Sequence, residues 1–343
     1  MTTKIIATIG PKSETPEMLE ALFQAGVDIV RINFSHATYD QYKRIKQTID
    51  SYNLKSGKKI ALMLDLQGPR IRVGQMPEEG IMMKEGETYN FSFLGKPYKK
   101  KGDIIPIDSE DLYKDMKKGE CLFLCNGAIE LKVTGVKGKT ISAKVLNGGV
   151  LSSRKGINVP DTNIKKGGMT AKDVKDAKFG VKAGMDYIAL SFVQTEEDVK
   201  RLRTLLGKGS KVKVISKIER GIALKNIDRI ISASDAIMVA RGDLGIEVPI
   251  EDLPIIQKNL VRHAHWHDRP AIIATQVMTS MIKNPHPTRA EISDIANAVF
   301  DGADMVMLSD ETTVGAYPLE AVSLLKKVIE RTERNIYKGN INN

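Results

Sequence analysis

Charged side chains with complementary chemistry stand in two short runs in the second half of the chain. Lys217 and Glu219 are two residues apart, and Asp243 lies in the run Ala240-Arg241-Gly242-Asp243-Leu244-Gly245. Two carboxylates together with substrate oxygens are the usual ligands of a magnesium ion, because hard divalent cations prefer oxygen. The small residues around Gly242 leave backbone N–H groups open to an anion where the chain turns into a helix. These residues predict a site for a divalent cation and an anionic substrate.

Further polar residues follow other hydrophobic runs in the same way. They are Arg31, Asn33, Ser35, Asp65, Arg241, Thr275, Ser309 and Glu311. If each run is a strand of one parallel sheet, all of these side chains converge on one edge of it. Lys217 and Arg31 would then supply positive charge there without a P-loop. The alternative interpretation is that the charges only cap helices and solubilise the rim, but the agreement among separate loops favours a site.

The elements that must position these residues are visible as an alternation. Strand-like β-branched runs are predicted at 4–9, 29–34, 60–66, 187–191, 212–217, 236–239, 271–275 and 305–308. Amphipathic helical stretches follow them at 16–24, 39–52, 170–182, 251–265, 289–300 and 318–334. Two more are a helix that begins at 195 and, after the next strand, a helix that ends at 230. Such an alternation predicts an α/β fold with a parallel sheet, and eight units close a (β/α)8 TIM barrel. An open doubly wound sheet is the alternative, but it would normally carry a glycine-rich phosphate turn after the first strand.

Residues 73–157 interrupt the third unit. Helical periodicity is lost there, and short alternating segments at 89–93, 122–124, 129–133 and 140–145 are separated by glycine turns. This pattern predicts an all-β domain inserted between the third strand and its helix, at the barrel mouth that carries active sites. We therefore expect a lid. The predicted division is barrel over 1–72, β-barrel-like lid over 73–157, barrel again over 158–338, and a polar tail over 339–343.

Composition excludes several classes of protein. Of the 343 residues, 42% are hydrophobic and 27% charged, which is typical of globular chains and not of disordered ones. The net charge of +10 suggests nucleic acid, but the basic residues are spread out, and the cluster Lys99-Lys100-Lys101 lacks interleaved aromatic residues. Anionic small substrates explain the charge equally well. No apolar run approaches the roughly 18 residues of a membrane span, and Met1–Gly10 does not resemble a secretory signal. We expect a cytoplasmic protein that binds neither nucleic acid nor membranes.

Three local patterns suggest sites that we reject. Gly138-Lys139-Thr140 resembles the end of a P-loop, but Val133 stands where the first glycine is required. His263 and His267 share a helix face, yet they precede the seventh strand, at the end of the barrel opposite the chemistry. Trp266 beside them is interpreted as a helix-packing anchor. Cys121 and Cys125, four apart on a predicted strand, are interpreted as small apolar packing residues.

Longer stretches of the chain resemble the pyruvate kinases. The motifs that carry the resemblance are Thr8–Pro11, Val30–His36, Leu64–Arg72, Lys155–Asn158, Ser216–Glu219, Met238–Gly245, Ala274–Gln276 and Lys283–Asn297, of which Asn284-Pro285-His286-Pro287-Thr288-Arg289-Ala290-Glu291 is the most specific. The resemblance covers essentially the whole chain. It implies a barrel with a β lid and transfer of a phosphoryl group from phosphoenolpyruvate to ADP, giving pyruvate and ATP in the last step of glycolysis.

The resemblance also implies roles for individual positions. Arg31 would hold the transferring phosphoryl group and Lys217 would stabilise its charge. Glu219 and Asp243 would bind Mg2+ or Mn2+, while the backbone amides of Gly242 and Asp243 receive the substrate carboxylate. The remaining roles are Thr275 close to the enolate, Ser309 and Glu311 on the proton-delivery path, and Asn33, Phe34, Ser35, His36, Arg72 and Lys155 on the nucleotide side. Phosphoryl transfer depends mainly on positioning and charge neutralisation, which this set would provide.

Three departures from the family pattern change what we expect. The chain stops at a polar tail where the family continues into a domain that carries the effector site, so we expect no allosteric regulation. Any oligomer should use barrel contacts, which favours a homodimer over a tetramer. Two lid aspartates of the family are absent at Cys125-Asn126. Arg70 stands where potassium-dependent relatives have glutamate, whereas relatives with lysine there are generally potassium-independent. We expect Arg70 to replace the monovalent cation, leaving Asn33, Ser35, Asp65 and the Leu66 carbonyl as remnant ligands.

Two other functions compete with this interpretation. Metal-dependent aldolases that handle pyruvate or phosphoenolpyruvate also place a Glu and an Asp on a metal near an Arg. The nucleotide-side residues and the lid argue against that class. A non-catalytic basic binding module is the second alternative, and the presence of Lys217, Glu219, Asp243 and Thr275 argues against it.

Overall fold

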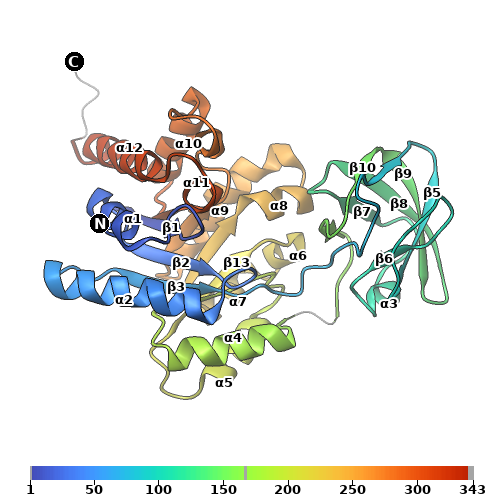
Figure 1. Ribbon diagram of the computed structural model, residues 1–343, viewed down its shortest axis with the longest axis horizontal. Coiled ribbons are helices and arrows are strands. Elements are labelled where there is room, and N and C mark those ends of the chain that lie inside the picture. The colour runs from blue at the N-terminus through green and yellow to red at the C-terminus, as the bar shows by residue number, and fades with distance from the viewer. Residues whose placement is uncertain (1, 166–167, 339–343) are drawn as a thin grey trace.

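Eight parallel strands close into a barrel in the computed structural model, which describes residues 2–165 and 168–338 (Figure 1). The strand order around the barrel is β1-β16-β15-β14-β13-β12-β3-β2. The bounds are β1 Lys4–Thr8, β2 Ile29–Asn33, β3 Ala61–Asp65, β12 Tyr187–Leu190, β13 Lys213–Ile218, β14 Ala236–Ala240, β15 Ala271–Ala274 and β16 Met305–Leu308. Each agrees with the predicted strand to within a residue, and the predicted barrel is confirmed.

Helices surround the barrel and cover its outer face. The long ones are α1 Pro16–Ala25, α2 Tyr39–Ser56, α4 Ala171–Lys182, α5 Glu196–Leu206, α7 Ile227–Ala233, α9 Leu253–Trp266, α10 Arg289–Phe300 and α12 Pro318–Lys338. Short helices absent from the prediction precede several of them: α6 Gly221–Leu224, α8 Arg241–Glu247, the 3-10 turns Ile250–Asp252 and Thr279–Ile282, and α11 Asp310–Thr313. Of these, α6, α8 and α11 closely follow β13, β14 and β16, so they help to build the mouth of the barrel. The predicted polar tail lies outside the described residues.

The opposite end of the barrel is tied by a repeated aspartate. Asp28, Asp186, Asp235 and Asp304 each stand one residue before a strand, and each accepts a hydrogen bond from a backbone N–H of a neighbouring strand at 2.7–2.9 Å. The pairs joined in this way are β2 with β1, β12 with β3, β14 with β13, and β16 with β15. These hydrogen bonds fix the register of neighbouring strands at this end of the barrel, and the loops of the cavity lie at the other end.

Three separate apolar cores stabilise the molecule. The largest lies between the barrel and its helices and includes Leu22, Ile45 and Ile230. A smaller one fills the barrel interior, with Met63, Met238 and other side chains that point inward from the strands. The third belongs entirely to residues 71–159 and forms the interior of the inserted domain. A core of its own is what a separately packed lid requires.

The inserted domain is built mainly of β-strands and projects from one end of the barrel (Figure 1). Its larger sheet has the order β11-β7-β8-β9-β5-β6, and β10 pairs with β4. The bounds are β4 Ile81–Met83, β5 Thr88–Phe93, β6 Ile105–Ile107, β7 Cys121–Leu124, β8 Ile129–Lys137, β9 Thr140–Asn147, β10 Gly149–Leu151 and β11 Ile157–Asn158. The predicted lid is present, although the expectation of no helix there is wrong, because α3 spans Leu112–Asp115.

Two interpretations of single residues change with the structure. Trp266 is 73% exposed at the end of α9, so it is not a packing anchor. Cys125 follows β7 in a left-handed turn with φ 54°, so it does not share a strand face with Cys121. Both thiols are free and half-buried. His263 and His267 both contact the Asp228 carboxylate, at 2.8 and 3.2 Å.

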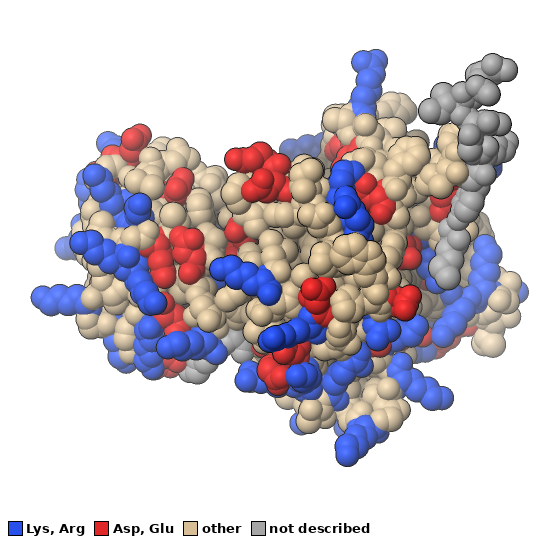
Figure 2. Space-filling model, turned by 180° about the vertical axis from the view of Figure 1, so that it is seen from behind, with Lys and Arg blue, Asp and Glu red and all other residues tan. Residues whose placement is uncertain are grey.

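On the face drawn in Figure 2, basic side chains lie beside acidic ones on both lid and barrel. This distribution does not resemble the continuous basic stripe of a nucleic-acid binder. Among the helices of the described chain, none combines the length and the apolar character needed to cross a membrane.

The most specific motif of the sequence, residues 284–291, forms a helix cap. Thr288 is the N-cap of α10, and the Glu291 carboxylate accepts hydrogen bonds from the Thr288 backbone N–H at 2.7 Å and from the Ser280 N–H at 2.8 Å. Burial opposes ionisation of Glu291, but the hydrogen bonds from Ser280 and Thr288 outweigh it and lower the pKa of the carboxyl. The motif therefore fixes the loop after β15 to the start of α10.

We expect Glu291→Ala to destabilise the fold by about 1–2 kcal/mol, the usual contribution of a cap. Because the pKa is lowered in the folded state, the stabilisation is present above the ordinary value of 4.5 and is lost as the pH falls below it. Urea unfolding at pH 7 and at pH 3 measures the difference. Exposed Arg289→Ala is the matched control, for which a change within about 0.5 kcal/mol is expected. Equal losses for Glu291→Ala at both pH values would contradict the assignment.

Candidate active site

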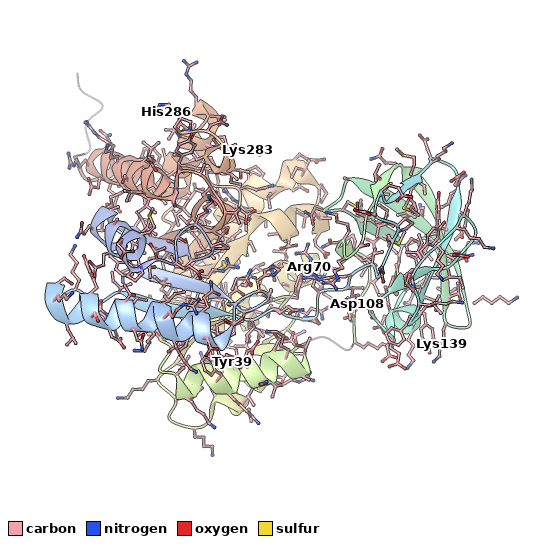
Figure 3. The ribbon with its side chains drawn as sticks, in the orientation of Figure 1. Tyr39, Arg70, Asp108, Lys139, Lys283 and His286 are labelled. Carbon is pink, nitrogen blue, oxygen red and sulfur yellow. The ribbon has the colours of Figure 1, made fainter. Side chains whose placement is uncertain are left out.

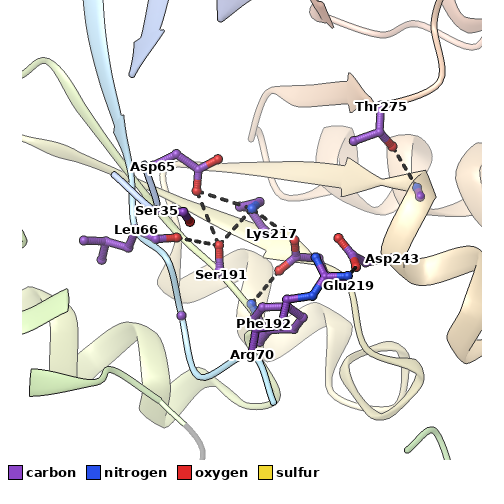
Figure 4. A network of polar contacts seen from close by, with 12 residues as sticks. Ser35, Asp65, Leu66, Arg70, Ser191, Phe192, Lys217, Glu219, Asp243 and Thr275 are labelled. Carbon is purple, nitrogen blue, oxygen red and sulfur yellow. Dashed lines mark hydrogen bonds and ion pairs between the residues drawn. The ribbon is translucent and has the colours of Figure 1, made fainter. Parts of the chain in front are cut away.

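A cavity of about 130 Å³ opens at the carboxyl ends of the barrel strands. Loops from separate strands contribute to it, as the sequence predicts, and the lining includes Arg31, Asn33, Ser35, Asp65, Leu66, Arg70, Lys217, Glu219, Asp243 and Thr275. Figure 4 shows most of these side chains and the polar contacts among them. Larger hollows lie at the other end of the barrel, but their linings do not include this set of charged residues.

Lys217 is the centre of the network. It lies within β13 rather than after it, and its Nζ is 3.3 Å from Asp65 Oδ1, 3.0 Å from Glu219 Oε1 and 2.8 Å from Ser191 Oγ (Figure 4). Burial alone would lower the pKa of Lys217, but the adjacent carboxylates of Asp65 and Glu219 raise it. The amine therefore stays protonated and presents a fixed positive charge to the cavity.

Arg31 supplies the second positive charge. Its Nε donates to Asp65 Oδ2 at 2.7 Å and its Nη1 donates to Thr8 Oγ1 at 2.9 Å. Burial opposes ionisation of Asp65, yet the charges of Lys217 and Arg31 together lower its pKa. Asp65 thus stays ionised and orients both cations toward one space. Two held cations with no bulky phosphate loop suit an anionic substrate.

Glu219, which directly follows β13, and Asp243 in α8 face the same cavity. Glu219 Oε2 accepts the backbone N–H of Phe192 at 2.6 Å. Burial raises the pKa of Glu219; Lys217 lowers it, and the nearby negative charge of Asp243 raises it further. Two carboxylates that repel each other across a polar cavity form a donor set that suits a hard divalent cation. No cluster of three or more His, Cys, Asp or Glu able to hold a metal occurs among the described residues, so further ligands would come from substrate or water.

Thr275 lies at the rim in a left-handed conformation with φ 67°, which is uncommon for a residue other than glycine. Its Oγ1 accepts a hydrogen bond from the Gly242 N–H at 2.7 Å, so its own proton is directed elsewhere. Arg241 does not point into the mouth, contrary to the sequence prediction. Its buried guanidinium donates to the backbone carbonyls of Thr275 and Gln276, both at 2.9 Å from Nη2. Arg241 therefore holds the unusual backbone of Thr275 in place.

Arg70 lies where the barrel meets the lid (Figure 3). Its Nη2 is 3.3 Å from Asp243 Oδ1 and donates to Asn126 Oδ1, in the lid, at 3.1 Å. The guanidinium therefore lines the cavity with the predicted remnant potassium ligands and does not point into solvent. Of these, Leu66 O already accepts a hydrogen bond from Ser191 Oγ at 2.8 Å.

Some predicted residues lie outside the cavity. The Glu311 carboxylate accepts the backbone N–H groups of Met278 and Ser309, at 3.0 and 2.8 Å, and so joins two loops. Phe34 is buried against Phe179. The predicted residues that do not line the cavity are Phe34, His36, Arg72, Lys155, Arg241, Gly242, Ser309 and Glu311.

Sequence reasoning missed Ser191, Phe192 and Thr8. Ser191 Oγ accepts from Lys217 and is 3.3 Å from Asp65 Oδ1, and Phe192 supplies the N–H that holds Glu219. The available signal was position, because Ser191 directly follows the fourth barrel strand as the other site residues follow theirs. Thr8 is the last residue of β1 and accepts from Arg31; the sequence pattern places it in the motif Thr8–Pro11 but assigns it no role.

The sequence of this chain matches both a family model and individual known proteins. Residues 1–322 match the family model described as pyruvate kinase, barrel domain. Pyruvate kinase from Sporosarcina psychrophila is 41% identical over 338 residues, which are 97% of this chain and 57% of that protein. The pyruvate kinases of Agrobacterium vitis and Thermotoga maritima are 42% and 40% identical, over 97% of this chain and 68% and 72% of their own lengths. The chain thus spans little more than half of some relatives.

Fold and cavity together define a (β/α)8-barrel protein with an inserted β lid and a mouth of paired cations and carboxylates. Within that class, the extent of the match over barrel and lid decides the family. The chain belongs to the pyruvate kinase family.

Proposed function

We propose that this chain transfers a phosphoryl group from phosphoenolpyruvate to ADP, forming ATP and pyruvate. The observation that carries the proposal is Lys217 Nζ, buried between Asp65 and Glu219 in a cavity shared with Arg31, Asp243 and Thr275. The bond between phosphorus and the enol oxygen breaks, a bond to a β-phosphate oxygen of ADP forms, and the resulting enolate takes a proton at carbon.

Arg31 and Lys217 would hold the transferring group from two sides, since Asp65 orients both. Thr275 would contact the enolate, because its hydroxyl already accepts from Gly242 and is free to donate. Glu219 and Asp243 would hold Mg2+ or Mn2+, which neutralises charge on substrate oxygens when bound. We further propose that the Gly242 and Asp243 amides receive the carboxylate and that Ser309 and Glu311 act on the proton path.

The nucleotide side is proposed on Asn33, Phe34, Ser35, His36, Arg72 and Lys155. Arg72 and Lys155 belong to the two segments that connect barrel and lid, where Arg72 and Gly156 pair in antiparallel β geometry. A nucleotide there would lie between the two domains. We propose the division 1–72, 73–157 and 158–338 for barrel, lid and barrel. We also propose a cytoplasmic location, in keeping with a glycolytic enzyme, and a homodimer through barrel contacts as the favoured oligomer.

A lactate-dehydrogenase-coupled assay tests the proposal. Purified chain should consume NADH only when phosphoenolpyruvate, ADP and Mg2+ or Mn2+ are all present, and a chelator should abolish the rate. Pyruvate formation without ADP would favour an aldolase-like or hydrolytic reaction instead. Absence of turnover with intact folding would favour a binding module.

We expect the 343-residue polypeptide to follow hyperbolic kinetics, with no strong response to sugar phosphates or AMP. Allostery needs a second site that prefers one of two states, and the residues matched here are those of the barrel domain. Initial rates against phosphoenolpyruvate concentration, with and without each effector, provide the measurement. A sigmoidal curve that an effector makes hyperbolic would contradict the expectation.

A further inference from the structure

A buried ion pair lies directly behind the two carboxylates proposed to bind the divalent cation. Arg220 Nε is 2.9 Å from Glu247 Oε2, and the side chains are 7% and 0% exposed. Arg220 follows Glu219 in the chain, and Glu247 is the last residue of α8, one helical turn after Asp243. The pair therefore joins the two elements that carry the two carboxylates.

The same pair holds the chain that returns from the lid. Arg220 Nη2 donates to the backbone carbonyls of Val159 and Thr162, both at 3.0 Å. Asn158, the last residue of β11, donates from Nδ2 to Glu247 Oε1 at 3.3 Å. One buried cluster thus contacts the end of β13, the end of α8 and the returning lid segment.

Stability alone does not account for this cluster. A buried ion pair is often no better than an apolar pair of similar volume, because desolvation offsets the attraction. Unsatisfied polar atoms add a further cost. Within the described part of the chain, Arg220 Nε and Glu247 Oε2 form an ion pair but no hydrogen bond, and the neighbouring Asn158 Oδ1 and Gln194 Oε1 are also buried without a hydrogen-bond partner. What an apolar pair cannot supply is directed polar contacts, here from Arg220 to two backbone carbonyls of the returning lid segment and to the Glu247 carboxylate at the end of α8.

We propose that Arg220 and Glu247 are positioning residues that set the separation of Glu219 and Asp243 and make it depend on the seating of the lid. The inference rests on the proposed function only in assigning the divalent cation to Glu219 and Asp243. Groups that orient metal ligands from behind commonly change metal affinity by about 10- to 100-fold when removed. Small shifts matter because a site must hold its geometry within about 0.5 Å.

The experiment measures Mn2+ binding to the full chain by electron paramagnetic resonance of free Mn2+, without substrate or nucleotide. Arg220→Met leaves Glu247 buried and unpaired, so it should both destabilise the protein and weaken Mn2+ binding. The double variant Arg220→Met with Glu247→Leu removes both charges. It should regain thermal stability close to that of the wild type while binding Mn2+ about 10- to 100-fold more weakly.

Two further variants complete the set. Arg220→Lys keeps the charge but not the paired donors, and it should bind Mn2+ with intermediate affinity. Lys258→Met removes another partly buried ion pair, to Asp301 on the outer helices, and should leave Mn2+ affinity unchanged. In turnover assays the double variant should raise the Mn2+ concentration needed for half-maximal rate more than it lowers the rate at saturating Mn2+.

The outcomes are distinct. Wild-type Mn2+ affinity in a stable double variant overturns the inference, and so does a wild-type chain that binds no Mn2+. If the double variant is too unstable to measure, Glu247→Gln replaces it: this variant keeps the volume and must still show at least a several-fold loss of affinity. A wild-type chain that binds Mn2+ with the expected pattern but makes no pyruvate from ADP and phosphoenolpyruvate refutes the proposed function and leaves the inference standing.

Discussion

Lys217→Met should lower turnover by about 10²–10³-fold, the usual effect of removing one group that stabilises transition-state charge. Lys217 Nζ is the only cation of the described chain shown in contact with both Asp65 and Glu219, at 3.3 and 3.0 Å. Methionine retains the length of the side chain but not its charge. Coupled assays at saturating phosphoenolpyruvate, ADP and Mg2+ give the measurement, and residual activity above about a tenth of wild type would refute the role.

The variant also has a structural consequence that the assay must separate. Removing one partner of a buried pair commonly costs about 3–5 kcal/mol, but Asp65 keeps its 2.7 Å contact with Arg31. We therefore expect a folded but less stable protein. Circular dichroism at the assay temperature establishes folding, and Lys258→Met is the control for losing an ion pair away from the cavity. A variant that loses activity only by unfolding would leave the catalytic role without support.

The barrel could be predicted from sequence because each buried parallel strand is a short apolar run bounded by turns, and an amphipathic helix follows it before the next barrel strand. The third strand, Ala61–Asp65, illustrates this, since Leu62, Met63 and Leu64 are all buried. The same regularity places Asp65, Lys217 and Thr275 at one edge, because parallel strands end together. Site residues on strand ends were therefore accessible from their spacing alone.

The remainder depends on contacts between distant segments. Arg241 directly follows β14 and Lys217 lies near the end of β13, yet the Arg241 guanidinium binds the carbonyls of Thr275 and Gln276 instead of facing the cavity. Nothing in the local sequence distinguishes the two cases. The lid strands β4 and β10 are three residues long and pair only with each other, so neither gives a signal without its partner.

The structure also changes the basis of the potassium prediction. Asp65, the charged member of the remnant ligand set, already contacts Arg31 and Lys217, and Arg70 adds a third cation to the same cavity. The Arg70 guanidinium contacts Asn126 and Asp243, one of the two carboxylates proposed to bind the divalent cation. Its effect on a monovalent cation is therefore expected to act through charge across the cavity.

We expect full activity without potassium, and we expect Arg70→Glu to become potassium-activated. Two unit charges about 4 Å apart repel by about 4 kcal/mol at an effective dielectric of 20, so an added monovalent cation would be strongly opposed beside the permanently charged guanidinium. Glutamate removes that repulsion and supplies attraction.

Turnover is measured in tetramethylammonium buffer with and without roughly 100 mM potassium, which is of the order of physiological ionic strength. Saturating Mg2+ compensates for the altered neighbour of Asp243. Arg70→Lys, which retains the charge, should remain potassium-independent. Strong activation of the wild type by potassium would show that the arginine does not replace the ion, whereas activation confined to Arg70→Glu would show that its charge does.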